Sequence, residues 1–567
     1  MKFTDQIQVF VNDTNKLINA FIEENRPSVV TLGPRYSTLS PSDAASQLRL
    51  YRMCKKWSLP SGSDASRAQD SVKAMFDYDA NGLTEFSVST IPNEYLRYQL
   101  NNARYSLQRG LRNFKLDYSE FDMPSGETSV SSNGHTSVWA KLKDPSQWCC
   151  SSSALPYFTR IVYNSPSLKY AFRLHVLRYG RMKRLPGENG FETFSRYFTK
   201  FVQITEVSRI TTVPKDASVD RVILCEPMGN MIVERCIAKS IISFIKREFG
   251  VSLEDSQDVH KYLISMDSNA TIDLSKASDS NWMCVIRFML GDTPLFRLLD
   301  AVRIPTVRYK QTYHHLNMIS PMGNGFTFEV MTLILLAVTR QFDSFSHVFG
   351  DDIVVHNEVA GDVIDILHHL GYKINTSKTF VDSPFRESCG GFYSDGYITS
   401  FDFWYADNIV EAIVNVNKLG ILSSIDTRYA DLYREIVDLA PVSLLGAWLY
   451  FVPFKSIEDK HTVIARHYGR DYINILPNRL ASDHIVVHPR YLEKRRRSCV
   501  KGKVKPSHDR QADKTVKVKS TPYQVHVRGK KVNRFFPRSN LKGFLLCHFL
   551  YAGLVDPTIR RERIIFS

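Results

Sequence analysis

Two adjacent carboxylates, Asp351 and Asp352, stand between short apolar runs in the stretch SHVFGDDIVVH at residues 346–356. The flanking segments HVF and IVV are typical of two strands joined by a tight turn, with Gly350 at the bend. Like charges at the rim of a buried sheet repel each other, which costs free energy unless a cation compensates. A solvated turn is the alternative, because a Gly-Asp-Asp triplet alone is weak evidence. The apolar setting favours a metal site.

A second carboxylate lies upstream in SNATIDLSKASDSNWMCVIRFML, residues 268–290. The segment begins as a strand that ends near Asp273 and then turns into a helix. Polar residues 278–280 are predicted to cap that helix at its start. The helix would bury one apolar face, formed by Trp282, Val285, Ile286 and Met289. Asp273 is therefore expected at the end of a strand.

A calcium loop is an alternative for the same stretch, because Asp267, Asn269 and Thr271 alternate as EF-hand ligands do. That motif requires glycine at its sixth position and glutamate at its twelfth, where this chain has Ile272 and Ser278. The EF-hand is therefore rejected. The chain also lacks the GxxxxGK[ST] motif of P-loop nucleotide hydrolases and the HExxH motif of zinc proteases.

Between the two acidic segments lies the glycine-containing stretch MISPMGNGFTFEVMTLILLAVTRQF, residues 318–342. Gly323 and Gly325 allow a loop of close backbone approach, and the apolar helix that follows must be buried. Asn324 and Thr327 stand at its mouth, where amides and N–H groups can hold a sugar or a phosphate. A glycine-rich helix cap that binds nothing is the alternative.

These three segments together predict one site. Two divalent cations about 4 Å apart need carboxylates from separate elements to converge on them. Asp273 from a strand and Asp351 with Asp352 from a hairpin would provide those carboxylates.

The whole chain has 567 residues, of which 43% are hydrophobic and 23% charged. This length predicts three or four globular units, using about 150 residues each as a guide. The net charge of +15 favours a polyanionic partner, either nucleic acid or an anionic membrane surface. The longest apolar run is far shorter than the roughly 20 residues of a membrane-spanning helix, and the first residues do not resemble a signal peptide. The nine scattered cysteines are expected to be free thiols in a reducing compartment.

Nearly all of the net positive charge falls in residues 490–534, where sixteen Lys and Arg accompany three acidic residues. A solvated basic tail is one interpretation, and a surface that follows RNA phosphates is the other. The two are compatible. The candidate RNA-binding residues are Arg495, Arg496, Arg497, Lys501 and Lys503.

The quoted segments, with NTSKTFVDSPFRESCGGFYSDG at residues 375–396 and TTVPKDASVDRVILCEP at residues 211–227, stand in a recognisable order. They resemble motifs A, B, C, D with E, and F of the RNA-directed RNA polymerases of positive-strand RNA bacteriophages. The resemblance is to the levivirus replicase catalytic (beta) subunit and covers residues 211–400. The chain departs from it at Phe349, where relatives commonly have tyrosine, and at Pro321, where a small polar residue is common.

The resemblance implies roles for individual residues. Asp273, Asp351 and Asp352 would hold two Mg²⁺ ions, for which Mn²⁺ can substitute, and Asp351 would be the surer ligand of the hairpin pair. Lys378 would be the general acid that protonates pyrophosphate, and an exposed lysine in a polar turn is the alternative. Arg386 and Glu387 would begin a hairpin that supports the primer end, and a structural ion pair between them is expected.

Nucleotide binding is implied for a second group of residues. Lys215 and Arg221 would clamp the triphosphate, since fixed cations offset charge on the leaving pyrophosphate. Asp279 and Asn324 would test the ribose 2′-OH, and Gly323 would belong to the same nucleotide-binding loop. Helix capping explains Asp279 equally well.

The implied fold is α+β, a right-hand polymerase with an antiparallel palm sheet backed by helices. Its expected divisions are an N-terminal region with the fingers (1–210), the palm (211–400), a helical thumb (401–489) and a basic C-terminal region (490–567). The implied partners are template and product RNA, NTPs, host elongation factors Tu and Ts and a small-subunit ribosomal protein. The implied location is the cytoplasm of the infected bacterium, with no membrane attachment.

Two rival functions remain open. The first is another palm polymerase, such as a reverse transcriptase or the replicase of a capsidless RNA element, which nucleotide preference would distinguish. The second is a non-catalytic RNA-binding scaffold with a degenerate palm, against which the three carboxylates argue.

Overall fold

The computed structural model describes residues 3–25, 32–57, 65–122, 127–130, 141, 145–215, 219–407 and 409–440, and the backbone of four short strands between 484 and 534. The chain forms two compact units, and each is described by itself. One comprises residues 1–30, 49–58 and 400–567, and the other comprises residues 31–48 and 59–399.

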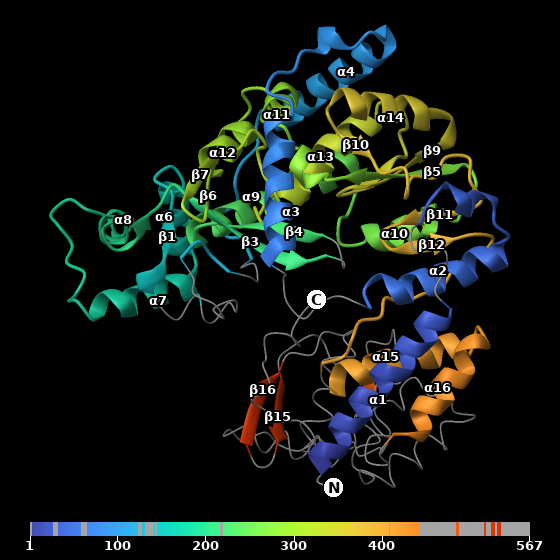
Figure 1. The fold of residues 1–567 in the computed structure, drawn as a ribbon. Coiled ribbons are helices and arrows are strands. Elements are labelled where there is room, and N and C mark those ends of the chain that lie inside the picture. The colour runs from blue at the N-terminus through green and yellow to red at the C-terminus, as the bar shows by residue number, and fades with distance from the viewer. Residues whose placement is uncertain are drawn as a thin grey trace. The chain divides into compact units, whose positions relative to one another are not determined.

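The first unit joins the N-terminal helix to helices that follow residue 400. Helix α1 (Phe3–Glu24) packs against α15 (Ile409–Ser423) and α16 (Arg428–Asp438), as Figure 1 shows. Their shared core holds Ile18, Ile413 and Tyr429 among other buried residues. The predicted division at residue 400 coincides with a boundary between the units, but residues 1–30 pack with the C-terminal helices.

Two ladders complete the described part of this unit. They pair β13 (His484–Val486) with β14 (Thr515–Lys517), and β15 (Tyr523–Val527) with β16 (Lys530–Arg534). The candidate RNA-binding residues Arg495, Arg496, Arg497, Lys501 and Lys503 lie outside the described residues.

The second unit is built around a four-stranded antiparallel sheet with the order β10-β5-β9-β8. Its strands are β5 (Asn269–Ser275), β8 (His347–Phe349), β9 (Asp352–His356) and β10 (Lys373–Ile374). The β-branched residues at the centre of β9 fit a buried position between β5 and β8. Helix α14 (Ala360–His369) packs over β5 and β10, which Figure 1 also shows. The predicted antiparallel sheet backed by helices is confirmed in this unit.

A second sheet has the order β4-β3-β6-β7 and mixes strand directions. Strand β3 (Ser208–Pro214) pairs antiparallel with β4 (Asp220–Cys225) and parallel with β6 (Thr306–Tyr309), and β7 (Thr312–His315) completes the sheet. Two smaller ladders pair β1 (Cys149–Cys150) with β2 (Gln203–Ile204), and β11 (Arg386–Ser388) with β12 (Gly391–Tyr393).

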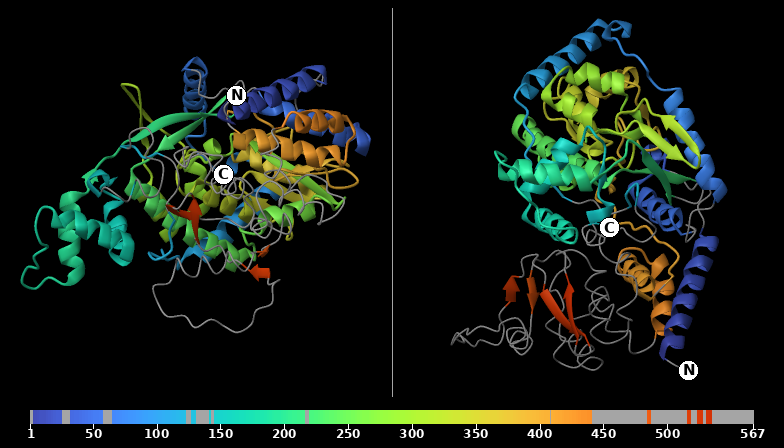
Figure 2. Two further views of the ribbon diagram at one scale, coloured as in Figure 1. Left: turned by 90° about the horizontal axis from the view of Figure 1, so that it is seen from below. Right: turned by 90° about the vertical axis from the view of Figure 1, so that its left-hand side faces the viewer.

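The remaining elements are helical. Among the described residues, the α-helices not yet named are α2 (Pro41–Lys55), α3 (Ala65–Ala80), α4 (Glu94–Leu111), α6 (Leu155–Asn164), α7 (Pro166–Leu177), α8 (Gly190–Phe201), α9 (Met228–Phe249), α10 (Ser256–Leu263), α11 (Met283–Leu290), α12 (Pro294–Val302) and α13 (Thr327–Thr339). Short 3₁₀ turns are η1 (Pro34–Thr38), η2 (Val88–Thr90), η3 (Pro145–Gln147), η4 (Ser278–Ser280) and η5 (Asn357–Val359). Figure 1 and the left view of Figure 2 show α7 and α8 at one end of their unit, away from the sheet that carries β5.

Helix α13 forms the centre of the core, as its apolar sequence predicts. All its residues except Phe328 are buried, and the helix packs against α9, α4 and β8. No helix among the described residues is both long and apolar enough to cross a bilayer. The seven cysteines that the structure describes are free thiols.

One local prediction is wrong. Residues 278–280 form the separate turn η4, and helix α11 starts only at Met283. Its N-cap is Trp282, whose side chain makes no capping bond. The polar residues therefore do not cap the helix, because the chain turns before it begins. The predicted apolar face is confirmed, since Trp282, Val285, Ile286 and Met289 are buried.

Candidate active site

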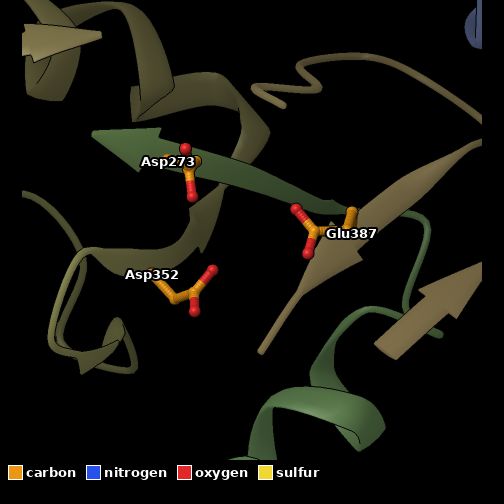
Figure 3. A group of neighbouring side chains, drawn as sticks. All are labelled: Asp273, Asp352 and Glu387. Atoms are coloured by element: carbon orange, nitrogen blue, oxygen red, sulfur yellow. The ribbon is translucent and has the colours of Figure 1, made fainter. Parts of the chain in front are cut away.

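Three carboxylates from three strands meet at one edge of the antiparallel sheet (Figure 3). Strands β5 and β9 pair in a register that sets Asp273 directly opposite Asp352, and Glu387 comes from the hairpin strand β11. One oxygen of each side chain lies within 4.8 Å of the others. Directly opposed residues on antiparallel strands point to the same face, so the register alone brings Asp273 and Asp352 together.

One ammonium group compensates part of this negative charge. Lys378 Nζ lies 3.4 Å from Asp273 Oδ1 and 3.7 Å from Glu387 Oε2. Burial alone would lower the pKa of Lys378, but Glu387, Asp273 and Asp352 together raise it above its usual value. The lysine therefore holds its proton firmly. Asn375 donates a hydrogen bond of 2.6 Å from its amide to Asp273 Oδ2, which fixes that carboxylate.

The pKa values of the two hairpin acids, Asp351 and Asp352, are raised by burial and by neighbouring negative charges. Burial raises the pKa of Asp352 to about 6, and the charges of Asp351 and Asp273 contribute to the same effect. Burial and Asp273 likewise raise the pKa of Asp351, while Lys378 and Arg221 oppose that rise. An added cation would relieve this repulsion, as the sequence predicts for a metal site.

The turn that carries the pair is formed as predicted. Gly350 adopts a φ of +65°, and a Cβ added there would lie 2.4 Å from the ring of Phe328. Its N–H donates to Thr332 Oγ1 at 3.0 Å, which ties the turn to helix α13. The ring of Phe349 packs edge-on against Phe328, so the aromatic packing at this position needs no hydroxyl.

Asp351 faces a neighbouring space. It lines a cleft of about 720 Å³ together with Arg221, Ser278 and loop residues 322–325. It is not a member of the three-carboxylate group identified among the described residues. The structure thus brings Asp273 and Asp352 together as predicted and places Asp351 beside the cleft. Its role as the surer metal ligand stays a prediction.

The glycine loop that forms part of this cleft is held by close backbone contacts. Gly323 has a φ of +108°, and a Cβ there would lie 2.3 Å from the carbonyl oxygen of Leu224. Leu224 N–H donates to Met322 O at 2.8 Å, so the loop lies against strand β4. The carbonyl oxygen of Pro321 accepts a hydrogen bond from Thr327 Oγ1 at 3.0 Å, which ties the loop to the start of helix α13. The predicted loop of close approach is confirmed.

The two residues predicted to contact the ribose, Asn324 and Asp279, lie in different surroundings. The side-chain amide of Asn324 is buried and donates to Glu226 and Glu234 at 3.3 and 2.9 Å. Its oxygen accepts from Phe326 N–H at 3.0 Å, so the hydrogen-bonding groups of this side chain are directed inward. Asp279 lies in η4, and burial raises its pKa to about 6. The ribose roles of Asp279 and Asn324 stay predictions.

The candidate triphosphate residues belong to the hairpin of β3 and β4. Arg221 lies on β4 opposite Val213, is exposed and lines the cleft beside Asp351. Lys215 follows the end of β3 and is also exposed. The structure therefore places Arg221 at the cleft and Lys215 farther along the same hairpin.

The expected ion pair between Arg386 and Glu387 is wrong. Consecutive residues of a strand point to opposite faces, so these two side chains diverge. Arg386 is buried and bonds to Asp267 at 2.7 Å and to the carbonyl oxygens of Ile264 and Ser383. Glu387 instead joins the carboxylate group. Strand alternation in the predicted hairpin was the signal that could have separated the two roles.

Known proteins resemble the part of the chain that carries this site. Residues 150–406 match the family described as RNA replicase, beta-chain. The RNA-directed RNA polymerase subunit beta of Qbeta virus (strain MX1) is 29% identical over 283 residues, covering 47% of this chain and 46% of the relative. The beta chain of Enterobacteria phage fr is 31% identical and that of Escherichia phage MS2 is 35% identical, and each match covers 42% of this chain and 46% of the relative. The match thus spans about half the length of each relative.

Two solved structures also align with the chain. One is the RNA-dependent RNA polymerase of a human picobirnavirus, with a TM-score of 0.32 and 12% identity, covering 78% of this chain and 95% of that one. The other is an RdRp complex, with a TM-score of 0.37 and 10% identity, covering 65% of this chain and 35% of that one. Scores this low describe a loose likeness, and the relationship rests on the sequence matches.

Proposed function

We propose that the chain is an RNA-directed RNA polymerase, because residues 150–406 match the RNA replicase beta-chain family and resemble the Qbeta and MS2 beta chains over about half of their length. The observation that carries the proposal is the meeting of Asp273, Asp352 and Glu387 beside a cleft that Arg221 and the loop 322–325 line. In the proposed reaction an RNA 3′-oxygen bonds to the α-phosphorus of an NTP while the bond to pyrophosphate breaks. A template base selects the NTP.

The proposed architecture is a right hand. The antiparallel sheet of β10, β5, β9 and β8 would be the centre of the palm, which was predicted to span residues 211–400 and so to include most of the β3 and β4 hairpin, and helices α3 to α8 would belong to the fingers. Helices α15 and α16 would begin the thumb. Support comes from the match to residues 150–406, which includes both sheets and their helices.

The carboxylate group fits a hard divalent cation. Carboxylate oxygens are the ligands that Mg²⁺ prefers, and burial together with the charges of Asp351 and Asp273 raises the pKa of Asp352. Asp273, Asp352 and Glu387 would hold Mg²⁺ or Mn²⁺, and Asp351 would complete a second position. Bound Mg²⁺ would lower the pKa of the attacking hydroxyl and stabilise charge on pyrophosphate.

The remaining side chains have roles in binding and proton transfer. Arg221 would bind the triphosphate from the hairpin side of the cleft, and Lys215 would extend that positive surface. Lys378 is protonated next to the carboxylates, and a cation held by these carboxylates would weaken their hold on its proton, as donation to the leaving pyrophosphate requires. Asn324 and Asp279 would affect ribose binding through the loop and through η4.

The proposed partners follow from charge and from the relatives. A net charge of +15 suits template and product RNA, bound through their phosphates. Host elongation factors Tu and Ts, a small-subunit ribosomal protein and a location in the cytoplasm of the infected bacterium are further proposals, which rest on the likeness to levivirus replicases.

The proposal is tested by incorporation of labelled nucleotides on an RNA template. We expect synthesis with NTPs and Mg²⁺, and none after chelation by EDTA. Preference for dNTPs would instead indicate a reverse transcriptase. RNA binding without incorporation under any condition, with or without the proposed host factors, would indicate a scaffold.

Replacing Glu387 with glutamine tests whether the third carboxylate serves the cation. The change keeps size and removes one charge, so we expect the Mg²⁺ concentration for half-maximal synthesis to rise by at least about tenfold. Glu358→Gln, at an exposed position after β9, is the matched control and should leave that concentration unchanged. An unaltered Mg²⁺ requirement in Glu387→Gln would remove this residue from the ligand set.

A further inference from the structure

Two buried glutamates lie beneath the glycine loop and outside the carboxylate group of the metal site. Glu226 directly follows strand β4 and is 1% exposed, while Glu234 lies in helix α9 and is fully buried. A pair of buried carboxylates costs a large desolvation free energy, which a folded chain tolerates only when hydrogen bonds or protons compensate. The proposed chemistry of nucleotide transfer uses neither residue.

Hydrogen bonds connect this pair to the loop. The Asn324 amide nitrogen donates to one oxygen of each glutamate, at 3.3 Å for Glu226 and 2.9 Å for Glu234. The N–H of Gly325 donates to the second oxygen of Glu234 at 2.8 Å. A Cβ on Gly325 would lie 2.8 Å from the Cβ of Glu234, so the loop backbone rests directly on α9. Glu234 therefore holds the loop at two consecutive residues.

The hydrogen-bond count leaves one oxygen without a donor. The buried Oε2 of Glu226 has no hydrogen-bonding partner among the described residues, and the single amide nitrogen of Asn324 bonds to an oxygen of each glutamate, which places the two carboxylates close together. Two carboxylates so close together cannot both be ionised in a buried site without strong repulsion. A single proton shared between them removes the repulsion and supplies a donor.

The surrounding charges do not replace that proton. Among the groups that the structure describes, the charged and titratable ones that interact with the pair are Arg235 of α9 and the Cys225 thiol. Arg235 also bonds to Asp122 at 2.6 Å, to Glu329 at 3.0 Å and to the carbonyl of Gly325 at 2.8 Å. Its positive charge is thus shared with two further carboxylates. Burial raises the pKa of both glutamates, and for Glu234 the charge of Glu226 adds to the effect.

We propose that Glu226 and Glu234 share one proton and act as positioning residues, holding the loop of residues 320–325 through Asn324 and Gly325. The pair fixes the wall of the cleft next to Arg221 and Asp351. An effect of this pair on nucleotide binding rests on the proposed function, because only a polymerase would bind NTP in this cleft. The proton and the loop contacts can be measured without any activity.

Variants of Glu234 separate the shared proton from simple packing. Glu234→Gln carries a permanent N–H donor toward Glu226 and keeps an acceptor for Gly325, although it loses the acceptor for the Asn324 amide. We therefore expect the loop to keep one of its two bonds to this side chain and to stay close to its place. Glu234→Ala removes both bonds to the loop. Glu248→Gln, at the exposed end of the same helix, is the matched control.

The direct readout is infrared spectroscopy at pH 8. The difference spectrum of wild type minus Glu234→Gln should show the carbonyl stretch of a protonated carboxyl group. The difference spectrum of wild type minus Glu248→Gln should not show it. Hydrogen exchange of a peptide covering residues 320–327 should be faster in Glu234→Ala, which loses both bonds to the loop, than in Glu234→Gln, which loses one. Absence of the infrared band, or equal exchange in both Glu234 variants, would overturn the proposal even if the chain proved not to be a polymerase.

The kinetic readout applies once synthesis is established. We expect Glu234→Ala to raise the KM for NTP about tenfold with a smaller change in kcat, since lost loop bonds weaken binding first. Glu234→Gln should stay within about twofold of wild type, on the same reasoning. A KM in Glu234→Gln as high as in Glu234→Ala would contradict the shared proton.

The pH dependence of the unfolding temperature gives an independent test of the shared proton. A carboxyl whose pKa is raised in the folded state contributes stability at low pH that is lost as pH rises through the folded-state pKa. The unfolding temperature of wild type should therefore fall below that of Glu234→Gln progressively as pH rises. A difference independent of pH would mean that no proton is shared.

Discussion

Replacing Asp273 with asparagine is expected to reduce RNA synthesis by at least about 10³-fold, because a cation site that stabilises charge in the transition state contributes several kcal/mol. Asp273 is central among the three carboxylates, since it faces Asp352 across the strand pair and contacts Lys378. Asparagine keeps the size of the side chain and removes its charge. The measurement is labelled NTP incorporation, with RNA binding assayed in parallel and expected to be unchanged.

Matched variants sharpen this test. Asp258→Asn makes the same chemical change at an exposed position of α10 in the same unit, and it should leave synthesis intact. Asp352→Asn should match Asp273→Asn, while Asp351→Asn reports whether the cleft-facing acid is also a ligand and is expected to lose synthesis. Wild-type synthesis by Asp273→Asn would end the assignment of the site.

Replacing Gly323 with alanine is expected to lower the free energy of unfolding by about 3 kcal/mol and to impair synthesis. Two effects combine at this position. Its φ of +108° is unfavourable for residues with a Cβ, and the added atom would lie 2.3 Å from the carbonyl oxygen of Leu224. The strand β4 or the loop must move, and the same loop lines the cleft. Calorimetry and the KM for NTP measure the two consequences.

Gly180→Ala separates those effects. Gly180 has a similar φ of +135°, but a Cβ there would meet no atom within 4 Å. That variant should lose only about 1 kcal/mol, from the backbone conformation alone. If Gly323→Ala were as stable as Gly180→Ala and bound NTP normally, the close contact between loop and strand would not matter for function.

The acidic hairpin and the buried helix illustrate what could be predicted from the sequence. Gly350 between two short apolar runs indicates a tight turn, and the turn has the positive φ that glycine allows. The apolar sequence of α13 requires burial on all sides. Both follow from local preferences and from the hydrophobic effect, which act without knowledge of distant segments. The predicted helix start near Ser278 is wrong, because several consecutive polar residues could each begin the helix equally well.

The sequence by itself determined the local elements of this protein, the acids Asp273, Asp351 and Asp352, and the order of motifs in residues 211–400 that resembles that of phage replicases. The tertiary structure decided which groups share a site. Glu387 enters the carboxylate group, Asp351 turns to the cleft, and Asn324 is directed to two buried glutamates. These outcomes depend on strand register and on the packing of α9 beneath the loop. Register and packing join residues far apart in the chain, so no local pattern contains them.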